Sequence, residues 1–76
     1  MYYLVEITTY NNGTKDAFGV YAHETEDGAV SAFHQKLAGA MRNETYQTEM
    51  CLVLDANGVV RKFEKWTRKI VPEVAE

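Results

Sequence analysis

The fold is decided by residues 25–43, T-E-D-G-A-V-S-A-F-H-Q-K-L-A-G-A-M-R-N, where the hydrophobic pattern changes to a helical repeat. Thr25 suits an N-cap, because its hydroxyl can accept a hydrogen bond from an N–H group of the first turn. Glu26 and Asp27 follow it, at the end where the helix dipole favours negative charge. Asn43 is a reasonable terminator. We therefore expect one helix whose apolar stripe consists of Val30, Phe33, Leu37, Ala40 and Met41.

Two pairs of strand patterns flank this helix. Their segments are rich in β-branched and aromatic residues, which is typical of strands. Asn12-Gly13 joins the first pair, and D-A-N-G at 55–58 joins the second; asparagine and glycine tolerate the positive φ that tight turns use. The element order is therefore ββαββ, with strands expected at residues 2–10, 16–23, 46–54 and 59–66.

The helix has to carry the chain from the second strand to the third. A right-handed crossover that skips the first strand gives the spatial order 2-1-3-4, although the order 1-2-3-4 uses the same pattern. We expect the first order, in which the sheet is wholly antiparallel and its two most apolar strands are central. The predicted fold is α+β, with a four-stranded antiparallel sheet and one helix packed on one face. A single domain would span residues 1–68, followed by a loose C-terminal tail at 69–76.

Composition limits the class of protein. A chain of 76 residues has room for one small domain, whose margin of stability is thin. Cys51 is the single cysteine, so no intrachain disulfide can form, whereas secreted domains of this size usually carry several. We see no signal-peptide pattern and no apolar run long enough to span a membrane. We therefore expect a soluble cytoplasmic protein, which would be the host cytoplasm for a phage-encoded one.

One helix covers only part of one face of a four-stranded sheet, so the other face should be bare. We expect the helix to pack on the face that carries Val5, Ile7, Phe18, Val20, Met50, Leu52, Leu54 and Phe63. The far face would then carry an apolar and aromatic patch, which is typical of an interface between protein chains. The predicted interface, in a homodimer or a larger assembly, consists of Tyr2, Leu4, Tyr21, Val53, Val60 and Trp66, with Cys51 among them. The alternative is that the tail folds back and covers this face with Ile70 and Val71.

The run R-K-F-E-K-W-T-R-K, residues 61–69, holds five of the eight basic residues. Charged residues on an edge strand discourage pairing with other chains, and we expect this role for the run. The alternatives are contact with an acidic partner or with nucleic acid, through Arg61, Lys62, Lys65, Arg68 and Lys69. Phe63 and Trp66 would face opposite sides of a regular strand, so they cannot form one base-stacking platform. The formal net charge of −3 also lacks the positive footprint of a nucleic-acid-binding protein.

Few residues point to chemistry. His34 lies on the predicted helix, His23 ends a strand, and their spacing matches no compact metal motif. Cys51 lies within an apolar strand, where cysteine usually behaves as a small hydrophobic residue. No set of nucleophile, base and oxyanion donor can be assembled from the sequence. We therefore expect neither an enzyme nor a cofactor or metal site.

Three stretches together resemble small uncharacterised proteins encoded in phage and prophage genomes. They are Y-L-V-E-I-T-T-Y-N-N-G-T, T-E-D-G-A-V-S-A-F-H-Q-K-L and V-L-D-A-N-G-V-V-R-K-F-E-K-W, residues 3–14, 25–37 and 53–66. The resemblance implies a phage accessory role and brings no catalytic residues. The resulting hypothesis is a homo-oligomeric interaction module that binds itself, and a host or virion protein, through its exposed sheet face. The alternatives are nucleic-acid binding through residues 61–69 and a small-ligand site between subunits formed by Tyr2, Tyr21 or Trp66.

Overall fold

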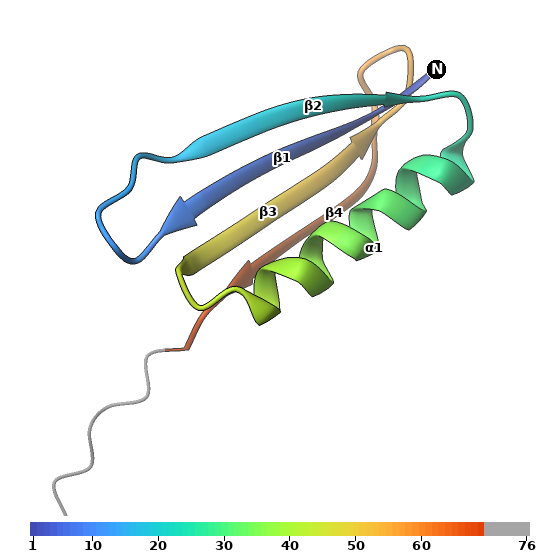
Figure 1. Ribbon diagram of the computed structural model, residues 1–76. Coiled ribbons are helices and arrows are strands. Elements are labelled where there is room, and N and C mark those ends of the chain that lie inside the picture. The colour runs from blue at the N-terminus through green and yellow to red at the C-terminus, as the bar shows by residue number, and fades with distance from the viewer. Residues whose placement is uncertain (70–76) are drawn as a thin grey trace, which may run out of the picture.

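The computed structural model describes residues 1–69 and contains one four-stranded antiparallel sheet with a single helix along one face (Figure 1). The strand order is β2-β1-β3-β4, which confirms the predicted ββαββ fold and its order 2-1-3-4. The elements are β1 (Tyr2–Tyr10), β2 (Ala17–His23), α1 (Glu26–Arg42), β3 (Tyr46–Leu54) and β4 (Val60–Thr67). The expected tail spans residues 69–76, of which the structure describes only Lys69; Ile70 and Val71, suggested to cover the far face of the sheet, lie outside the described residues.

The hairpin of β1 and β2 forms as predicted, but its loop is longer than a two-residue turn. Residues 11–16 connect the strands, so β2 begins at Ala17 rather than at Asp16. Gly13 has a φ of 85°, whereas Asn12 does not have a positive φ. A type I′ turn needs positive φ at both central residues, and this loop therefore belongs to a different class. Asn12 instead stabilises the loop by accepting a hydrogen bond from the N–H of Thr14 at 3.1 Å.

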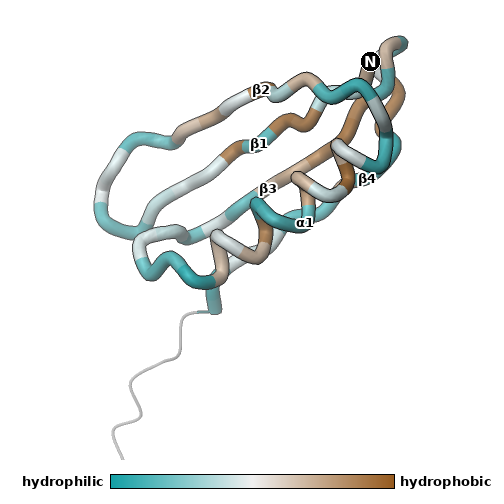
Figure 2. Tube along the Cα trace, turned by 45° about the vertical axis from the view of Figure 1, so that its right-hand side comes forward, coloured by the Kyte–Doolittle hydropathy of each residue, from teal (hydrophilic) through white to brown (hydrophobic). Residues whose placement is uncertain are grey.

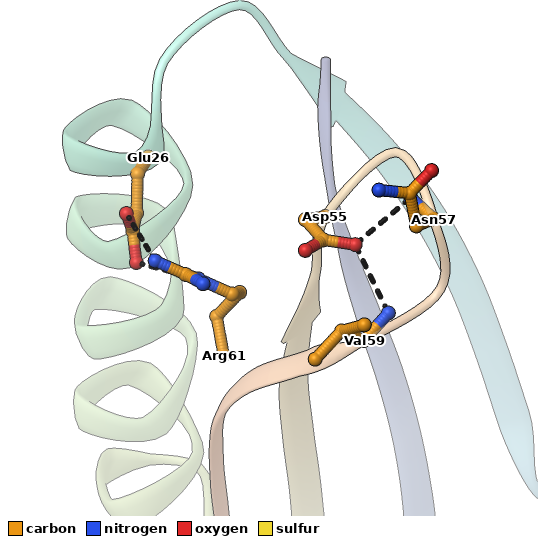
Figure 3. A network of polar contacts seen from close by, with 5 residues as sticks. All are labelled: Glu26, Asp55, Asn57, Val59 and Arg61. Carbon is orange, nitrogen blue, oxygen red and sulfur yellow. Dashed lines mark hydrogen bonds and ion pairs between the residues drawn. The ribbon is translucent and has the colours of Figure 1, made fainter.

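The second hairpin turns around Asp55. Its carboxylate accepts hydrogen bonds from the backbone N–H groups of Asn57 at 2.8 Å and Val59 at 3.0 Å (Figure 3). These bonds, led by the one from Val59, lower the pKa of Asp55. Gly58 takes the left-handed conformation, with a φ of 81°, and Asn57 does not. The turn thus depends on the aspartate side chain and one glycine.

The helix begins and ends where its capping residues predict. The Thr25 hydroxyl accepts a hydrogen bond from the N–H of Gly28 at 3.0 Å, and Asn43 is the C-cap. Its buried stripe differs from the prediction, because the helix is rotated so that Ala29 faces the sheet, and Val30 is only half-buried. Met41, which we expected in the stripe, is 50% exposed. The buried residues of α1 are Ala29, Phe33, Leu37 and Ala40.

The face of the sheet that contacts α1 is the opposite of the one expected. Leu4 of β1 and Cys51 and Val53 of β3 are fully buried and form the core with Phe33. The prediction failed because β3 contains five successive apolar residues at 50–54, so both of its faces are apolar. A two-residue period cannot then decide which face meets the helix. Figure 2 shows the hydrophobic stretches of β1 and β3 lying together in the middle of the sheet.

An irregularity in β4 changes the side on which one residue points. Lys62 is opposite Val53, but Val60 is opposite Leu54, so Arg61 is the additional residue of a β-bulge. Alternation would place Val60 with Lys62, whereas the register places it with Leu54. Val60 therefore lies on the face away from α1, while Lys62 lies on the face of α1.

We predict that replacing valine by threonine will distinguish the two faces. Val53→Thr should destabilise the protein by about 1–3 kcal/mol, because it buries a hydroxyl under the helix. Val20→Thr makes the same change at a position that is 63% exposed, and should alter stability by less than about 0.5 kcal/mol. Urea unfolding at high dilution measures both variants. Equal losses in the two variants would contradict the burial of Val53 under α1.

Candidate protein-interaction surface

The face of the sheet away from α1 is the main exposed feature of the molecule, and we call it the open face. Alternation and register place Val5 beside Val20 and Leu52, and Ile7 beside Phe18 and Met50. Its outer strands are widely exposed, with Phe18 at 83% and Val20 at 63%. The apolar and aromatic members of the open face are Tyr3, Val5, Ile7, Phe18, Val20, Met50, Leu52, Leu54, Val60 and Phe63.

Charge is sparse on the open face. Among the strand residues that the structure describes, the register places one charged side chain on the open face. This is Lys65 of the edge strand β4, which lies opposite Met50. A cation at the rim can stay hydrated when the centre of the patch is covered. The open face is therefore mainly apolar and aromatic, with one lysine at its β4 edge, and aromatic residues with few charges are typical of the core of a protein interface.

Four of the six residues predicted at the interface lie instead around the core under α1. Leu4 and Val53 are fully buried, and Tyr2 and Trp66 are partly buried and pack against the core. The assignment of Leu4 and Val53 to an exposed interface is therefore wrong. Both residues lie on the side of the sheet that packs against α1, because the prediction assigned the two faces of the sheet the wrong way round.

Tyr21 and Val60 remain accessible. Tyr21 is 41% exposed and lies on the helix side, where the Lys36 ammonium is 4.5 Å from its ring centroid. Val60 is 55% exposed and, because of the bulge, belongs to the open face. Of the six predicted interface residues, Val60 is thus the one that the open face contains.

A polar cluster lies between the sheet and α1, and the sequence reading did not find it. Glu49 is fully buried, and its carboxyl group accepts a hydrogen bond from the Thr8 hydroxyl. Burial, together with a hydrogen bond shared with Glu6, raises the pKa of Glu49 to about 7. Burial alone would raise the pKa of Glu6 as well, but the bond with Glu49 and the Lys36 ammonium at 3.4 Å lower it. At pH values between the pKa of Glu6 and about 7, Glu49 therefore holds a proton while Glu6 is ionised.

Cys51 belongs to the same cluster, and its environment makes the thiol unreactive. Its Sγ is 3.7 Å from Glu49 Oε2, and the thiol is fully buried. Burial, with the nearby Glu49 carboxyl group, raises the pKa of Cys51 to about 12. Because the thiolate is the nucleophilic form of cysteine, this residue is a poor nucleophile at neutral pH.

The basic residues of 61–69 do not form one surface. Arg61 pairs with Glu26 at the start of α1, with 3.3 Å between Nε and Oε2 (Figure 3). The Lys62 ammonium is 5.7 Å from the ring centroid of Phe33, on the helix side. Lys65 lies on the open face and Lys69 is exposed beyond β4. The residues proposed for nucleic-acid or acidic-partner contact are thus distributed over opposite sides of the sheet.

Arg68 joins the end of β4 to the end of α1. Its guanidinium donates hydrogen bonds to the carbonyl oxygens of Asn43 at 2.7 Å, Tyr46 at 2.8 Å and Ala40 at 3.4 Å. A helix C-terminus leaves such carbonyls without partners inside the helix, and a cation there also suits the helix dipole. Arg68 also lies over the Trp66 ring, with its Cζ 4.9 Å from the centroid. These contacts make Arg68 a structural residue.

The candidate chemical residues are dispersed. His34 is exposed on α1, and His23 ends β2 close to the start of α1. Across residues 1–69, no group of three or more histidine, cysteine, aspartate or glutamate side chains could hold a metal ion. Within the same residues, α1 is too short and too polar to cross a membrane.

The buried carboxyl group predicts a pH dependence of stability. The folded-state pKa of Glu49, about 7, lies above its ordinary value of 4.5, so the folded protein keeps a proton that the unfolded chain has lost. The contribution of Glu49 to the unfolding free energy should therefore be largest below about pH 4.5. It should fall by on the order of 3 kcal/mol as the pH rises to about 7, and then level off. Unfolding in urea across this pH range measures the slope.

Glu49→Gln should remove most of this slope, since glutamine has no proton to lose. Glu44→Gln, at an exposed position, is the matched control and should leave the slope unchanged. A slope that persists in Glu49→Gln would show that another group is responsible.

A second prediction concerns Arg68. Arg68→Ala should destabilise the protein by about 1–3 kcal/mol, because it removes the charge-assisted hydrogen bonds that the guanidinium donates to the carbonyl oxygens of Asn43, Tyr46 and Ala40. Lys69→Ala removes the same charge at the next, exposed position and should change stability by less than about 0.5 kcal/mol. Thermal and urea unfolding compare the two. Equal effects would mean that the guanidinium contacts contribute nothing beyond charge.

Comparison with known proteins adds no relative. No family model matches the chain, and the searches of curated proteins and of solved structures found no match. The phage accessory role implied by the resemblance, and the cytoplasmic location, therefore stay predictions. The function has to be argued from the geometry of the molecule itself.

Proposed function

We propose that this protein is a small non-enzymatic interaction module that self-associates by packing its open face against the open face of a second copy. The observation that carries the proposal is the apolar composition of the open face, with exposed aromatic residues such as Phe18 and Phe63. Isolated apolar residues are common on protein surfaces, but a contiguous patch across four strands is typical of an interaction site.

The pattern of β3 supports the proposal independently. Residues 50–54, M-C-L-V-L, are apolar on both sides of the strand. Continuous apolar runs are typical of strands that are covered on both faces. In a single chain α1 covers one side of β3 at Cys51 and Val53, and Leu52 on the other side is only half-buried. A partner that covers the open face would bury the second side of β3 as well, which matches the continuous apolar character of residues 50–54.

A second copy is the partner that fits the charge and size of the patch. The patch offers almost no charge for an oppositely charged partner to match, and an apolar patch is complementary to itself across a two-fold axis. Four strands at about 4.8 Å and seven residues at about 3.3 Å give a patch of roughly 440 Å² in planar projection. Two copies would bury about 900 Å² before the relief of the side chains is counted, close to the roughly 1,000 Å² of a specific interface.

The resulting dimer would be a sandwich of two sheets with one helix on each outer side. Sheets that pack face to face lie about 10 Å apart, with their strands about 30° from alignment. Lys65 would stay at the rim of this interface, where its ammonium can remain in water. The helix side, with its polar cluster, would not take part.

The alternative functions receive less support. Tyr2 and Trp66, suggested for a ligand site, are separated along the sheet. Tyr2 lies at the start of β1, opposite His23. Trp66 is opposite Glu49 of β3, and Glu49 is opposite Thr8 near the other end of β1. The six residue steps along β1 from Tyr2 to Thr8 correspond to about 20 Å. Nucleic-acid binding would need a common basic surface, and Arg61 and Arg68 are engaged in contacts with α1.

The proposal predicts that Leu52→Glu will halve the mass of the particle in solution. Leu52 lies on a central strand in the middle of the open face, and a carboxylate there would be desolvated on association. Light scattering coupled to size-exclusion chromatography, over a dilution series, measures the mass. Circular dichroism checks that the variant keeps its fold.

Met41→Glu is the matched control, because Met41 is also apolar and exposed but lies on α1. It should leave the mass unchanged. If Leu52→Glu and the unmodified chain have the same mass, the open face does not join copies of this chain, and the proposal is wrong.

A further inference from the structure

The two edges of the sheet differ in their protection against pairing with another strand. β4 carries four charged residues and a bulge, which are two of the devices that discourage such pairing. β2 carries no charged residue and no proline from Ala17 to Ala22, and it pairs with β1 in regular register. Its outer side chains are exposed, with Val20 at 63% and Tyr21 at 41%. The seven residues of β2 therefore form a regular edge strand whose outer side has no partner among the described residues.

The occupant of such an edge has to be an extended backbone. The outward N–H and C=O groups of an edge strand form a row of donors and acceptors that a neighbouring strand matches. We propose that the occupant is β2 of a second copy, paired antiparallel across a two-fold axis at Val20. This surface is distinct from the open face, so the inference goes beyond the proposed function and can hold or fail independently of it.

The sequence of β2 is complementary to itself in this register. Val20 is the central residue of the strand and would lie opposite Val20 of the second copy. Phe18 would then lie opposite Ala22, and Gly19 opposite Tyr21, so that a large side chain faces a small one at each position. Cross-strand pairs of this kind are the unit of stability in antiparallel sheets. A shift of the register by one residue in either copy would lose this matching.

Gly19 shows how little room the helix side of this edge offers. A Cβ atom at position 19 would lie 2.7 Å from the hydroxyl oxygen of Tyr21, so the ring already lies over the glycine. An aromatic ring over a glycine of an edge strand compensates for the side chain that the glycine lacks. In the pair, both Tyr21 rings would stand over positions that have no side chain. The nearby Lys36 ammonium is already paired with Glu6 at 3.4 Å and is therefore not an unbalanced charge at this edge.

The two-fold axis of an antiparallel strand pair runs perpendicular to the sheet. The two copies would therefore form one eight-stranded sheet, with both helices on one side and both open faces on the other. The outermost strand at each edge of this sheet would be β4, which carries the charged residues. Packing of the open faces uses an axis between the sheets, perpendicular to the first. Together the two contacts would produce a tetramer with D2 symmetry.

Disulfide formation by Val20→Cys tests the strand pairing. Opposite residues of an antiparallel pair have Cα atoms about 4.5–5.5 Å apart, which is within the range that a disulfide spans. Copies joined only through their open faces would hold these positions about 10 Å apart, which is too far. The native Cys51 is fully buried and does not compete. We expect mild oxidation to convert most of the variant into a covalent dimer that a reducing agent separates.

Val60→Cys is the matched control, since Val60 is a valine of similar exposure on the other edge of the sheet. It should remain mostly uncrosslinked. Val20→Cys should crosslink equally in the Leu52→Glu background, where the open face is blocked. Crosslinking of Val20→Cys no greater than that of Val60→Cys, or its loss in that background, would overturn the inference.

Hydrogen exchange supplies a readout that needs no substitution in β2. In the paired edge, successive amides from Ala17 to Ala22 should all be protected, because those that do not bond to β1 bond to the second copy. With Leu52→Glu, which blocks the open face, the protection should persist. Alternating fast and slow amides along β2 in that variant would contradict the inference even if the cysteine variant failed to fold.

Discussion

The packing of Phe33 against Leu4, Cys51 and Val53 is the interaction on which the rest of the structure depends. It decides which face of the sheet α1 covers, and a sheet whose strands are apolar on both sides leaves the other face uncovered. The exposed aromatic residues and the sandwich proposed for two copies both follow from this choice. A small domain with one helix can bury only one face of its sheet by itself.

The same choice explains the carboxyl groups under the helix. Glu49 and Thr8 belong to the face that α1 covers, so they are buried together with the apolar core. A buried carboxyl group is tolerated when it is hydrogen-bonded and neutral, and Glu49 meets both conditions through Thr8 and Glu6. Lys36 of α1 balances the charge that remains on Glu6. The packing of α1 on this face is therefore coupled to the protonation of Glu49.

The basic stretch at the end of the chain attaches β4 to both ends of α1. Arg61 contacts Glu26 in the first turn, and Arg68 donates to carbonyl oxygens at the last turn and the C-cap. Eight residues of a strand span about 23 Å between first and last, and the 17 residues of α1 span about 24 Å, so the two arginines are spaced to match the helix. Arg68 also suits the carbonyl end of the helix, which attracts cations, whereas Arg61 pairs with Glu26, one of the two acidic residues of the first turn. A run that resembles a nucleic-acid-binding stretch in sequence thus serves to hold the fold together.

The sequence by itself determined the elements and their order along the chain, and it favoured the strand order 2-1-3-4, which the structure then decided. These features depend on local signals, namely the helical repeat of residues 25–43, the cap at Thr25 and the turn residues, and on the handedness of crossovers. Only the tertiary structure decided which residues face the helix, because Leu52 and Val53 are equally suited to burial by their type. It alone showed that the bulge at Arg61 moves Val60 to the open face, and that Glu49 lies in the core. The physical reason is that orientation and register depend on the sum of packing over the whole sheet, which no local period contains.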